Sequence, residues 1–403
     1  MELTPGETSG LFWTALALTF TVSMICKPAV VFAGATMGLK AWWNIVFPSL
    51  LPFFIASELL MCFGVVNFIG VLMEPLMRPL FNVPGSGSFA MCIGYTSGYP
   101  IGAMVTARLR SQGLCTRTEA ERLISFTNNS SPLFMIVAVS VGMFGRPDLA
   151  PVIAGSHYLA NLTLGVMMRF YGRRGHDSTP AGPAENVARR ALQELTSAWK
   201  KEKRPLGKIL GDSVKNAVNN LLTIGGFIIL FAVIIRLMSE AGLIQQLSGL
   251  MGVLLTPFGL SKEIMPALAS GIFEMTIGSK LASESAAPLI QQIIAVEIIL
   301  AWSGLSVHAQ VAGMISDTDI RMLPFICARV AHAVLAAAYT FIIFNRTVAA
   351  ASAPIIPPAT WQSVFLKTPS FTETIIFSLI LLVFSLILLS FLSLAVHLAA
   401  KAK

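Results

Sequence analysis

A polar interruption inside an apolar segment constrains the fold of this chain more than any other feature of its sequence. The stretch over residues 94–132 reads GYTSGYPIGAMVTARLRSQGLCTRTEAERLISFTNNSSP, and it ends in two asparagines, two serines and a proline. Pro132 removes a backbone donor and disfavours the helical conformation at Ser131. At membrane depth such backbone is tolerated only where protein buries it or where it lines a cavity. We therefore interpret residues 94–132 as one half of a solute site.

The composition places this stretch in a membrane protein. Of the 403 residues, 55% are hydrophobic and 12% are charged, and the mean hydropathy is +0.74. Soluble proteins average about 25% charged residues. Several apolar runs reach the roughly 20 residues that a helix needs to cross a bilayer. We therefore predict an all-α polytopic membrane protein with the lipid bilayer as its surroundings, and the soluble enzyme classes are excluded.

The net charge of +8 is concentrated in one loop. Residues 172–208 hold nine Lys/Arg against four Asp/Glu. An excess of basic residues is typical of cytoplasmic loops in membrane proteins. The charge therefore indicates membrane orientation, and we expect no nucleic-acid partner.

Motifs of metal, redox and nucleotide chemistry do not occur in this sequence. The five cysteines are scattered singly, without a CxxC pair or metal-ligand spacing. We therefore expect no disulfide, no metal and no cofactor. The sequence also contains neither a GxxxxGK[ST] loop for ATP nor an HExxH motif. We predict that the chain is not an enzyme and is not driven directly by ATP.

Two segments combine apolar residues with helix breakers. Residues 85–109 hold five glycines and Pro100, and residues 264–285 read IMPALASGIFEMTIGSKLASES. A continuous spanning helix rarely carries so many breakers, so each segment predicts a re-entrant helical hairpin, which enters the membrane and returns. An apolar helix with an interruption follows each hairpin, at Asn128–Asn129 in the first half and around residues 302–306 in the second.

The order of these features repeats along the chain. Three residue pairs recur at offsets of 175 to 177 residues: Phe81 with Phe258, Ile101 with Ile277, and Ser131 with Ser306. If the basic loops over residues 108–122 and 172–208 are both cytoplasmic, the two hairpins enter the membrane from opposite sides. Inverted repeats with interrupted helices are an architecture of secondary transporters. The alternative is a helical bundle packed through glycine motifs.

Three motifs carry a resemblance to a known family. They are GYTSGYPIGA from residue 94, SFTNNSSPLF from residue 125 and AWSGLSVHAQ from residue 301. With these motifs the chain resembles the YlbJ/SpoVV family of sporulation integral membrane proteins over roughly residues 39–344. The resemblance implies paired nucleoside-recognition (Gate) domains, similar in plan to concentrative nucleoside transporters. It also implies movement of dipicolinate (pyridine-2,6-dicarboxylate) from the mother cell across the outer forespore membrane.

The expected organisation has five parts. They are an N-terminal span and interfacial helix (1–44), a first Gate-like repeat (45–171), a basic cytoplasmic linker (172–208), a second Gate-like repeat (209–345), and a C-terminal loop with a terminal transmembrane helix (346–403).

The polar residues at the two interruptions are the predicted solute contacts. They are Asn128, Asn129, Ser130 and Ser131 in the first half, and Ser303, Ser306, His308 and Gln310 in the second. Their side chains, together with the N-termini of the half-helices, would donate hydrogen bonds to an anion. The alternatives are helix-to-helix hydrogen bonds for the asparagines and small-residue packing for the serines.

Tyr99, Arg329 and Glu274 complete the set of candidates. The Tyr99 ring would stack on an aromatic solute, or it would simply pack the hairpin. Arg329 lies deep in an apolar helix, where charge is costly and suggests function. It would contact the anion, extend to the membrane surface, or form a structural pair with Glu297. Glu274 would bind a coupling proton or sodium ion, or it would pair with Lys280.

Three functional hypotheses remain open at this point. The first is a transporter of a small organic anion, dipicolinate by resemblance, that works by alternating access. The second is a nucleoside-type solute transporter. The third is a membrane scaffold or sensor in sporulation that moves no solute. The sequence leaves the coupling ion and assembly as a homo-oligomer open.

Overall fold

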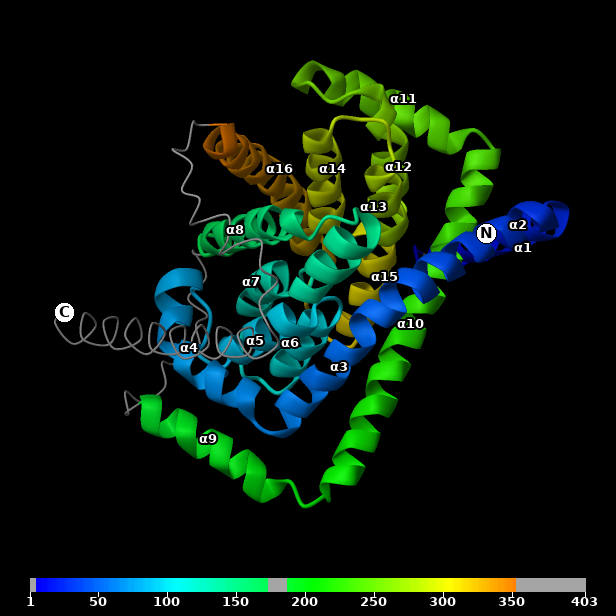
Figure 1. Cartoon of the computed structure of the whole chain (residues 1–403). Coiled ribbons are helices and arrows are strands. Elements are labelled where there is room, and N and C mark those ends of the chain that lie inside the picture. The colour runs from blue at the N-terminus through cyan, green and yellow to red at the C-terminus, as the bar shows by residue number, and fades with distance from the viewer. Residues whose placement is uncertain (1–4, 173–186, 353–403) are drawn as a thin grey trace.

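The computed structural model describes residues 5–172 and 187–352, and within these ranges the regular structure is helical throughout (Figure 1). Five stretches are long and apolar enough to cross a membrane by length and composition: Pro28–Cys62, Pro147–Met168, Leu206–Glu240, Leu289–Ile315 and Met322–Phe344. The all-helical membrane class predicted from composition is confirmed. The terminal helix expected within residues 346–403 lies outside the described residues, apart from the end of α16 (Met322–Ser352).

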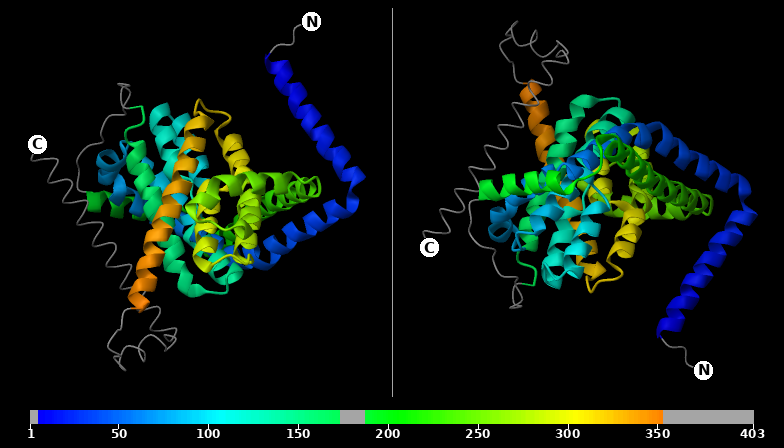
Figure 2. Two further views of the ribbon diagram at one scale, coloured as in Figure 1. Left: turned by 90° about the horizontal axis from the view of Figure 1, so that it is seen from above. Right: turned by 90° about the horizontal axis from the view of Figure 1, so that it is seen from below.

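The N-terminal helices form an arm beside the body of the molecule. In both views of Figure 2, α1 (Pro5–Cys26) stands apart from the other helices. Helix α2 (Pro28–Ala41) packs along α10 (Leu206–Glu240). This contact is close because Gly34 and Gly38 meet the α10 backbone, where an added Cβ would lie about 3 Å from Cα atoms. A π-helical turn, η1 (Trp42–Val46), then leads into α3 (Phe47–Cys62).

The segment between α3 and the first hairpin differs from expectation. The prolines over residues 73–84 suggest an irregular connector, yet α4 (Val65–Phe81) is helical through Pro75 and Pro79. The two prolines are four residues apart and share one face of the helix. Helix α4 also packs against α5 (Gly87–Ser97) and α9 (Val187–Lys201), so tertiary contacts outweigh the weak local propensity.

Two helical hairpins occupy equivalent positions in the two halves. The first consists of α5 and α6 (Ile101–Ser111), and the second of α12 (Met265–Phe273) and α13 (Met275–Ser283). Glycines at the crossings let the paired helices approach, Gly94 with Gly102 and Gly271 with Gly278. These pairs are related by the offset seen in the sequence. The tips of the two hairpins converge from opposite sides of the molecule (Figure 1).

An interrupted helix follows each hairpin. Helix α7 (Arg117–Thr127) ends before a non-helical stretch, and the chain resumes as the π-helical η2 (Phe134–Met143). Helix α14 (Leu289–Trp302) ends at Ser303, whose φ of 72° is left-handed, and α15 (Gly304–Ile315) continues from there. Both predicted interruptions are therefore present. A capping box formed by Thr116 and Glu119 starts α7.

The remaining helices surround the two hairpins and the two interrupted helices. Helices α8 (Ala150–Met168) and α16 pack against each other and against α14. Helix α10 runs as one long rod along the outside of the molecule (Figure 1). The short elements are η3 (Pro147–Leu149), α11 (Leu243–Leu255), η4 (Thr256–Phe258) and η5 (Lys262–Ile264).

Candidate functional site

The tip of the first hairpin rests on the interruption of its own repeat. Gly98 has a φ of 76°, and a Cβ added there would lie 2.9 Å from the Ser131 backbone nitrogen. Cβ atoms at Gly94 and Gly102 would overlap the Thr127 carbonyl oxygen. Glycine is therefore required at these contacts, because only a bare backbone can come this close to the end of α7.

The second hairpin tip makes the same kind of contact in its repeat. A Cβ added to Gly304, just after the break in α14–α15, would lie 3.1 Å from the Glu274 Cα. Glu274 stands between α12 and α13, and its Oε2 accepts a hydrogen bond of 2.7 Å from the Ile277 N–H. The predicted alternative partner, Lys280, pairs instead with Glu284 at 2.6 Å.

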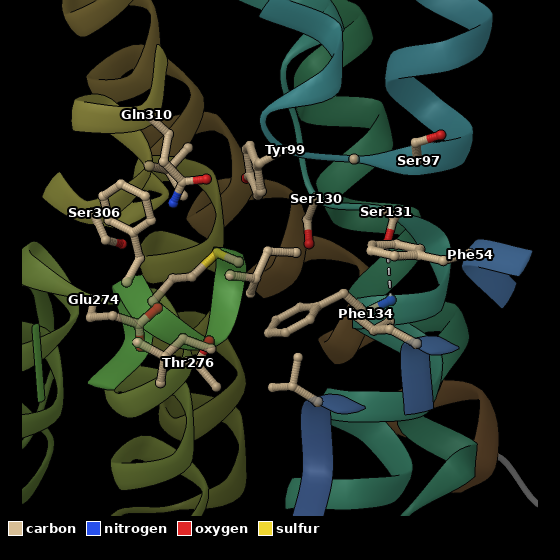
Figure 3. Close-up of a pocket in the computed structure, with 18 residues that line it drawn as sticks. Phe54, Ser97, Tyr99, Ser130, Ser131, Phe134, Glu274, Thr276, Ser306 and Gln310 are labelled. Carbon is tan, nitrogen blue, oxygen red and sulfur yellow. Dashed lines mark hydrogen bonds between the residues drawn. The ribbon is translucent and has the colours of Figure 1, made fainter. Parts of the chain in front are cut away.

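A small chamber lies where the two tips and the two interruptions meet. Figure 3 shows Glu274, Thr276, Ser306 and Gln310 on one side, and Tyr99, Ser130, Ser131 and Phe134 on the other. The chamber has a volume of about 40 Å³. It shares Phe54, Ser97, Tyr99 and Gln310 with a larger vestibule of about 1060 Å³. The vestibule therefore reaches the tip of the first hairpin, where it adjoins the chamber.

The vestibule is bounded by α3, by both helices of the first hairpin (α5 and α6), by α10 and by α15. Arg108 and Gln112 come from the end of α6, Glu58 from α3 and Gln310 from α15. The first half of α10 contributes polar residues, Asn216, Asn219, Asn220 and Thr223. These polar groups give the vestibule a wettable wall.

The structure gathers six of the predicted site residues around the chamber. They are Tyr99, Ser130, Ser131, Glu274, Ser306 and Gln310. Ser131 also accepts a hydrogen bond of 3.2 Å from the Phe134 N–H, so it caps the second half of the broken helix. The Tyr99 hydroxyl donates to the Leu300 carbonyl at 2.5 Å, which ties the first hairpin to α14.

The other five predicted residues lie behind the chamber wall in this conformation. Asn128, Asn129, Ser303, His308 and Arg329 are buried but are not among the lining residues. Ser303 Oγ donates to the Trp302 carbonyl, and His308 Nδ1 lies 2.8 Å from the Gly304 carbonyl. Both side chains therefore support the second interruption.

Arg329 caps the end of a half-helix. Its Nη1 donates to the Asn128 carbonyl at 3.0 Å, and its Nη2 donates to the Ser125 carbonyl. These carbonyls belong to the last turn of α7 and to the interruption after it, where a helix leaves acceptors without partners. A cation at a helix C-terminus also complements the helix dipole. Arg329 thus holds the first interruption in shape from behind.

The first interruption carries polar groups that are buried and unpartnered among the described residues. They include both side-chain atoms of Asn128 and the Ser130 hydroxyl. Such groups are costly to bury, so their presence needs a reason, such as a partner that they meet in another state. They lie beside the chamber, and a solute or a rearranged hairpin would supply the missing bonds.

Sequence reasoning missed several lining residues. Ser97 and Thr276 sit beside the two hairpin turns, next to the predicted Tyr99 and Glu274, so proximity to the breakers was a usable signal. Phe54 and Phe134 provide apolar rings. No signal in the sequence separates these rings from the many other aromatic residues of spanning helices.

The charge around the chamber comes from one carboxyl side chain and from helix N-termini. Among the described residues that line it, none is a Lys or Arg, and Glu274 carries a carboxylate. Helix α13 and helix α15 begin at the chamber, as does α6, and helix N-termini favour anions. Of the residues that the structure describes, no three His, Cys, Asp or Glu side chains form a group that could hold a metal ion.

Comparison with known proteins gives relatives of this chain. The family model for nucleoside recognition (Gate) matches residues 44–147. The sporulation integral membrane protein YlbJ of Bacillus subtilis (strain 168) is 49% identical over 331 residues, which are 81% of this chain and 81% of that protein. The uncharacterized protein BpOF4_10220 of Alkalihalophilus pseudofirmus is 29% identical over 157 residues, which are 36% of this chain and 34% of that protein.

One solved structure is similar across most of its length. It is the structure of CNTnw in an inward-facing, substrate-bound state, and the match covers 84% of this chain and 88% of that chain. The TM-score is 0.47 and the sequence identity is 14%.

Proposed function

Because this chain belongs to the family of the sporulation integral membrane protein YlbJ, we propose that it is a membrane transporter of a small organic anion. The expected solute is dipicolinate, which the family resemblance implies. The expected location is the outer forespore membrane, where transport would carry the solute out of the mother cell.

One observation carries this proposal. Two hairpin tips and two helix interruptions surround a chamber that adjoins the large vestibule and shares lining residues with it. At membrane depth, irregular backbone of this kind occurs where protein buries it or where it lines a cavity, and secondary transporters have their solute sites at such interruptions. A scaffold would not require glycines that seat each tip on an interruption, nor unpartnered polar groups beside a cavity.

The vestibule supports an assignment of this conformation as open to the cytoplasm. Arg108 and Gln112 at its mouth lie at the end of α6, in the basic stretch over residues 108–122, which the positive-inside rule assigns to the cytoplasm. On the far side, the two tips and the helices behind them close the chamber. A solute from the mother-cell cytoplasm would therefore enter through the vestibule.

Two contacts bind the first hairpin to the second repeat and limit how the protein can move. One is the Tyr99 bond to Leu300 at the tip. The other is the bidentate pair of Arg110 with Asp319, with N–O distances of 2.7 and 2.8 Å. Hydrogen bonds from Arg110 lower the pKa of the Asp319 carboxyl, so the pair persists across the physiological pH range. Alternating access would therefore move this hairpin together with α14 and α15, against α3 and α10.

Uptake into proteoliposomes tests the proposal. Labelled dipicolinate is offered with and without uridine as a competitor, and the pH and sodium gradients are varied separately. We expect saturable dipicolinate uptake that uridine does not inhibit. Saturable uridine uptake without dipicolinate uptake would favour a nucleoside transporter. The absence of flux for both solutes, in protein that is monodisperse and oriented, would favour the scaffold or sensor.

A nucleoside-type transporter is the second candidate because of one structural observation. The described lining of the chamber has no cationic side chain, which suits an uncharged solute better than a dianion. The matching family model is also described as nucleoside recognition. The competition arm of the uptake experiment separates the two solutes directly.

A further inference from the structure

A second polar cluster lies behind the chamber, between α8, α14 and α16. It consists of His157 on α8, Glu297 on α14, and Arg329 and His332 on α16, and all four side chains are 0% exposed. Ionisable groups at such depth are costly, and in membrane proteins they mark proton or ion pathways. Arg329 joins this cluster to the first interruption through its bond to the Asn128 carbonyl.

The centre of the cluster is a carboxyl group facing an imidazole. His157 Nδ1 lies 3.2 Å from Glu297 Oε2. The outer atoms of the pair, Glu297 Oε1 and His157 Nε2, have no hydrogen-bond partner among the described residues. With one proton on the imidazole the pair carries a charge of −1, and a second proton makes it neutral. The pair therefore has a vacant position for one proton.

His332 is fixed as a neutral ring by its two neighbours. Its Nε2 lies 3.1 Å from the His157 carbonyl, which can only accept, so Nε2 carries the hydrogen. Its Nδ1 lies 3.2 Å from Arg329 Nη1, which can only donate, so Nδ1 accepts. A proton on His332 would break its bond to Arg329. The Glu297–His157 pair is therefore the part of the cluster that can gain a proton without such a loss.

The cluster is connected to the chamber along two routes. Arg329 bonds to His332 on one side and to the Asn128 carbonyl on the other, and Asn128 belongs to the interruption that presents Ser130 and Ser131. In addition, the Leu300 carbonyl that accepts from Tyr99 is three residues from Glu297 on α14. The pair is thus linked to the first interruption through three hydrogen bonds, by way of His332 and Arg329, and to Tyr99 through one turn of α14 and one hydrogen bond.

The other titratable and charged groups around the pair have different roles from that of a proton acceptor. The phenols of Tyr95 and Tyr99 in the first hairpin, and of Tyr158 on α8, are uncharged at neutral pH. Arg329 stays charged and offsets the carboxylate. His308 on α15 packs against Trp302 and Phe325 and bonds to the Gly304 carbonyl. Glu274 lies in the chamber itself, with its carboxylate held by the α13 backbone.

We infer that the Glu297–His157 pair is the proton-binding site that couples solute movement to the pH gradient. This inference rests on the proposed transport function. One proton from the aqueous phase adds to the pair when the transporter exposes it to one side, and the same proton leaves on the other side. Only an O–H or N–H bond forms and breaks. In the conformation described, the pair is closed off from both sides.

Two readouts in proteoliposomes separate coupling from transport. Exchange of labelled for unlabelled dipicolinate at equal pH measures transport, and accumulation under an imposed pH gradient measures coupling. For Glu297→Gln and His157→Asn, accumulation should fall at least about tenfold, within the range usual for coupling between sites, while exchange falls much less. His157→Asn keeps a donor near the Nδ1 position but removes the imidazole that shares the proton with Glu297. If Glu297→Gln fails to fold, unchanged accumulation in His157→Asn overturns the assignment of the pair.

Two further variants serve as controls for the coupling experiment. Glu284→Gln removes an exposed carboxylate that is paired with Lys280 and should change neither readout. Glu274→Gln tests the chamber carboxylate as the competing coupling site. The inference is overturned if Glu297→Gln accumulates dipicolinate as well as the wild type does, or if wild-type accumulation ignores the pH gradient.

Infrared spectroscopy tests the proton site even if the transport proposal fails. Purified wild-type protein is titrated, and the carboxylic acid C=O band is compared with that of Glu297→Gln. A titrating band that is lost in the variant supports the site, whatever solute is carried. Identical bands in the two proteins would show that Glu297 takes up no proton, and would overturn the inference.

Discussion

At the residue scale, glycine is required at the hairpin crossings because the backbones touch. In Gly102→Ala the new methyl group would overlap the Thr127 carbonyl oxygen. We expect a loss of about 1–3 kcal/mol in the free energy of unfolding, as is typical of overpacking. The matched control is Gly313→Ala in α15, where no heavy atom lies within 4 Å of the added Cβ. Thermal unfolding in detergent compares them, and equal melting temperatures would contradict the packing described.

Ser306 provides the sharpest test of the chamber. It is buried and lines the chamber from the second repeat. A hydrogen bond to a charged solute contributes about 1.5–3 kcal/mol, so Ser306→Ala should raise the KM for dipicolinate by roughly tenfold or more at normal protein levels. Ser316→Ala, at the exposed end of the same helix, should leave the KM unchanged. A KM in Ser306→Ala equal to that of the wild type would remove Ser306 from the site.

At the level of single residues, the sequence predicted where the polar residues lie better than it predicted which groups they bond to. Ser130 and Ser131 could be found because they stand between apolar runs, where only a cavity or a protein contact tolerates them. Arg329 was predicted to contact the anion or pair with Glu297, and in this conformation it bonds to the carbonyls of Ser125 and Asn128. A sequence shows that a buried cation needs acceptors, but the acceptors come from tertiary structure, 201 and 204 residues away.

At the element scale, the broken helix α7–η2 depends on a cap supplied by α16. Arg329→Lys keeps the charge but loses the planar fork that reaches two carbonyls. Since bonds to a charged group contribute about 1.5–3 kcal/mol, we expect a destabilisation of about 2 kcal/mol and weaker solute binding. Arg189→Lys, on the exposed face of α9, is the control and should change neither. Denaturant unfolding measures the stability of the two variants, and the KM for dipicolinate reports solute binding. Equal stabilities of Arg329→Lys and the wild type would show that the cap is dispensable.

The elements themselves were predictable to different degrees. The hairpins and interruptions could be placed because glycine, proline and small polar residues break helices by known backbone chemistry. Residues 209–220 are amphipathic and residues 221–238 are apolar, which suggests two separate segments, yet α10 runs through both as one continuous helix. The reason is the vestibule: Asn216, Asn219 and Asn220 line it, so they are polar without ending the helix.

At the scale of the whole molecule, the vestibule defines a side of the membrane. In a variant without native cysteines, Asn220→Cys should react with a membrane-impermeant maleimide from the cytoplasmic face only. Ala286→Cys, which is exposed in the loop between α13 and α14, should react from the opposite face. Labelling of sealed vesicles of known orientation measures both rates. Reaction of both cysteines from one face would contradict the inverted arrangement.

The contacts between the two halves also bear on how such a protein arose. The first hairpin is fastened to the second repeat at its tip, by Tyr99 and Leu300, and at its base, by Arg110 and Asp319. Neither half can therefore complete the chamber by itself. An ancestor with a single repeat would have needed a second copy inserted in the membrane in the opposite orientation, as a dual-topology dimer. By the same reasoning, the two halves expressed as separate polypeptides should reconstitute one another, and either half expressed alone should fail.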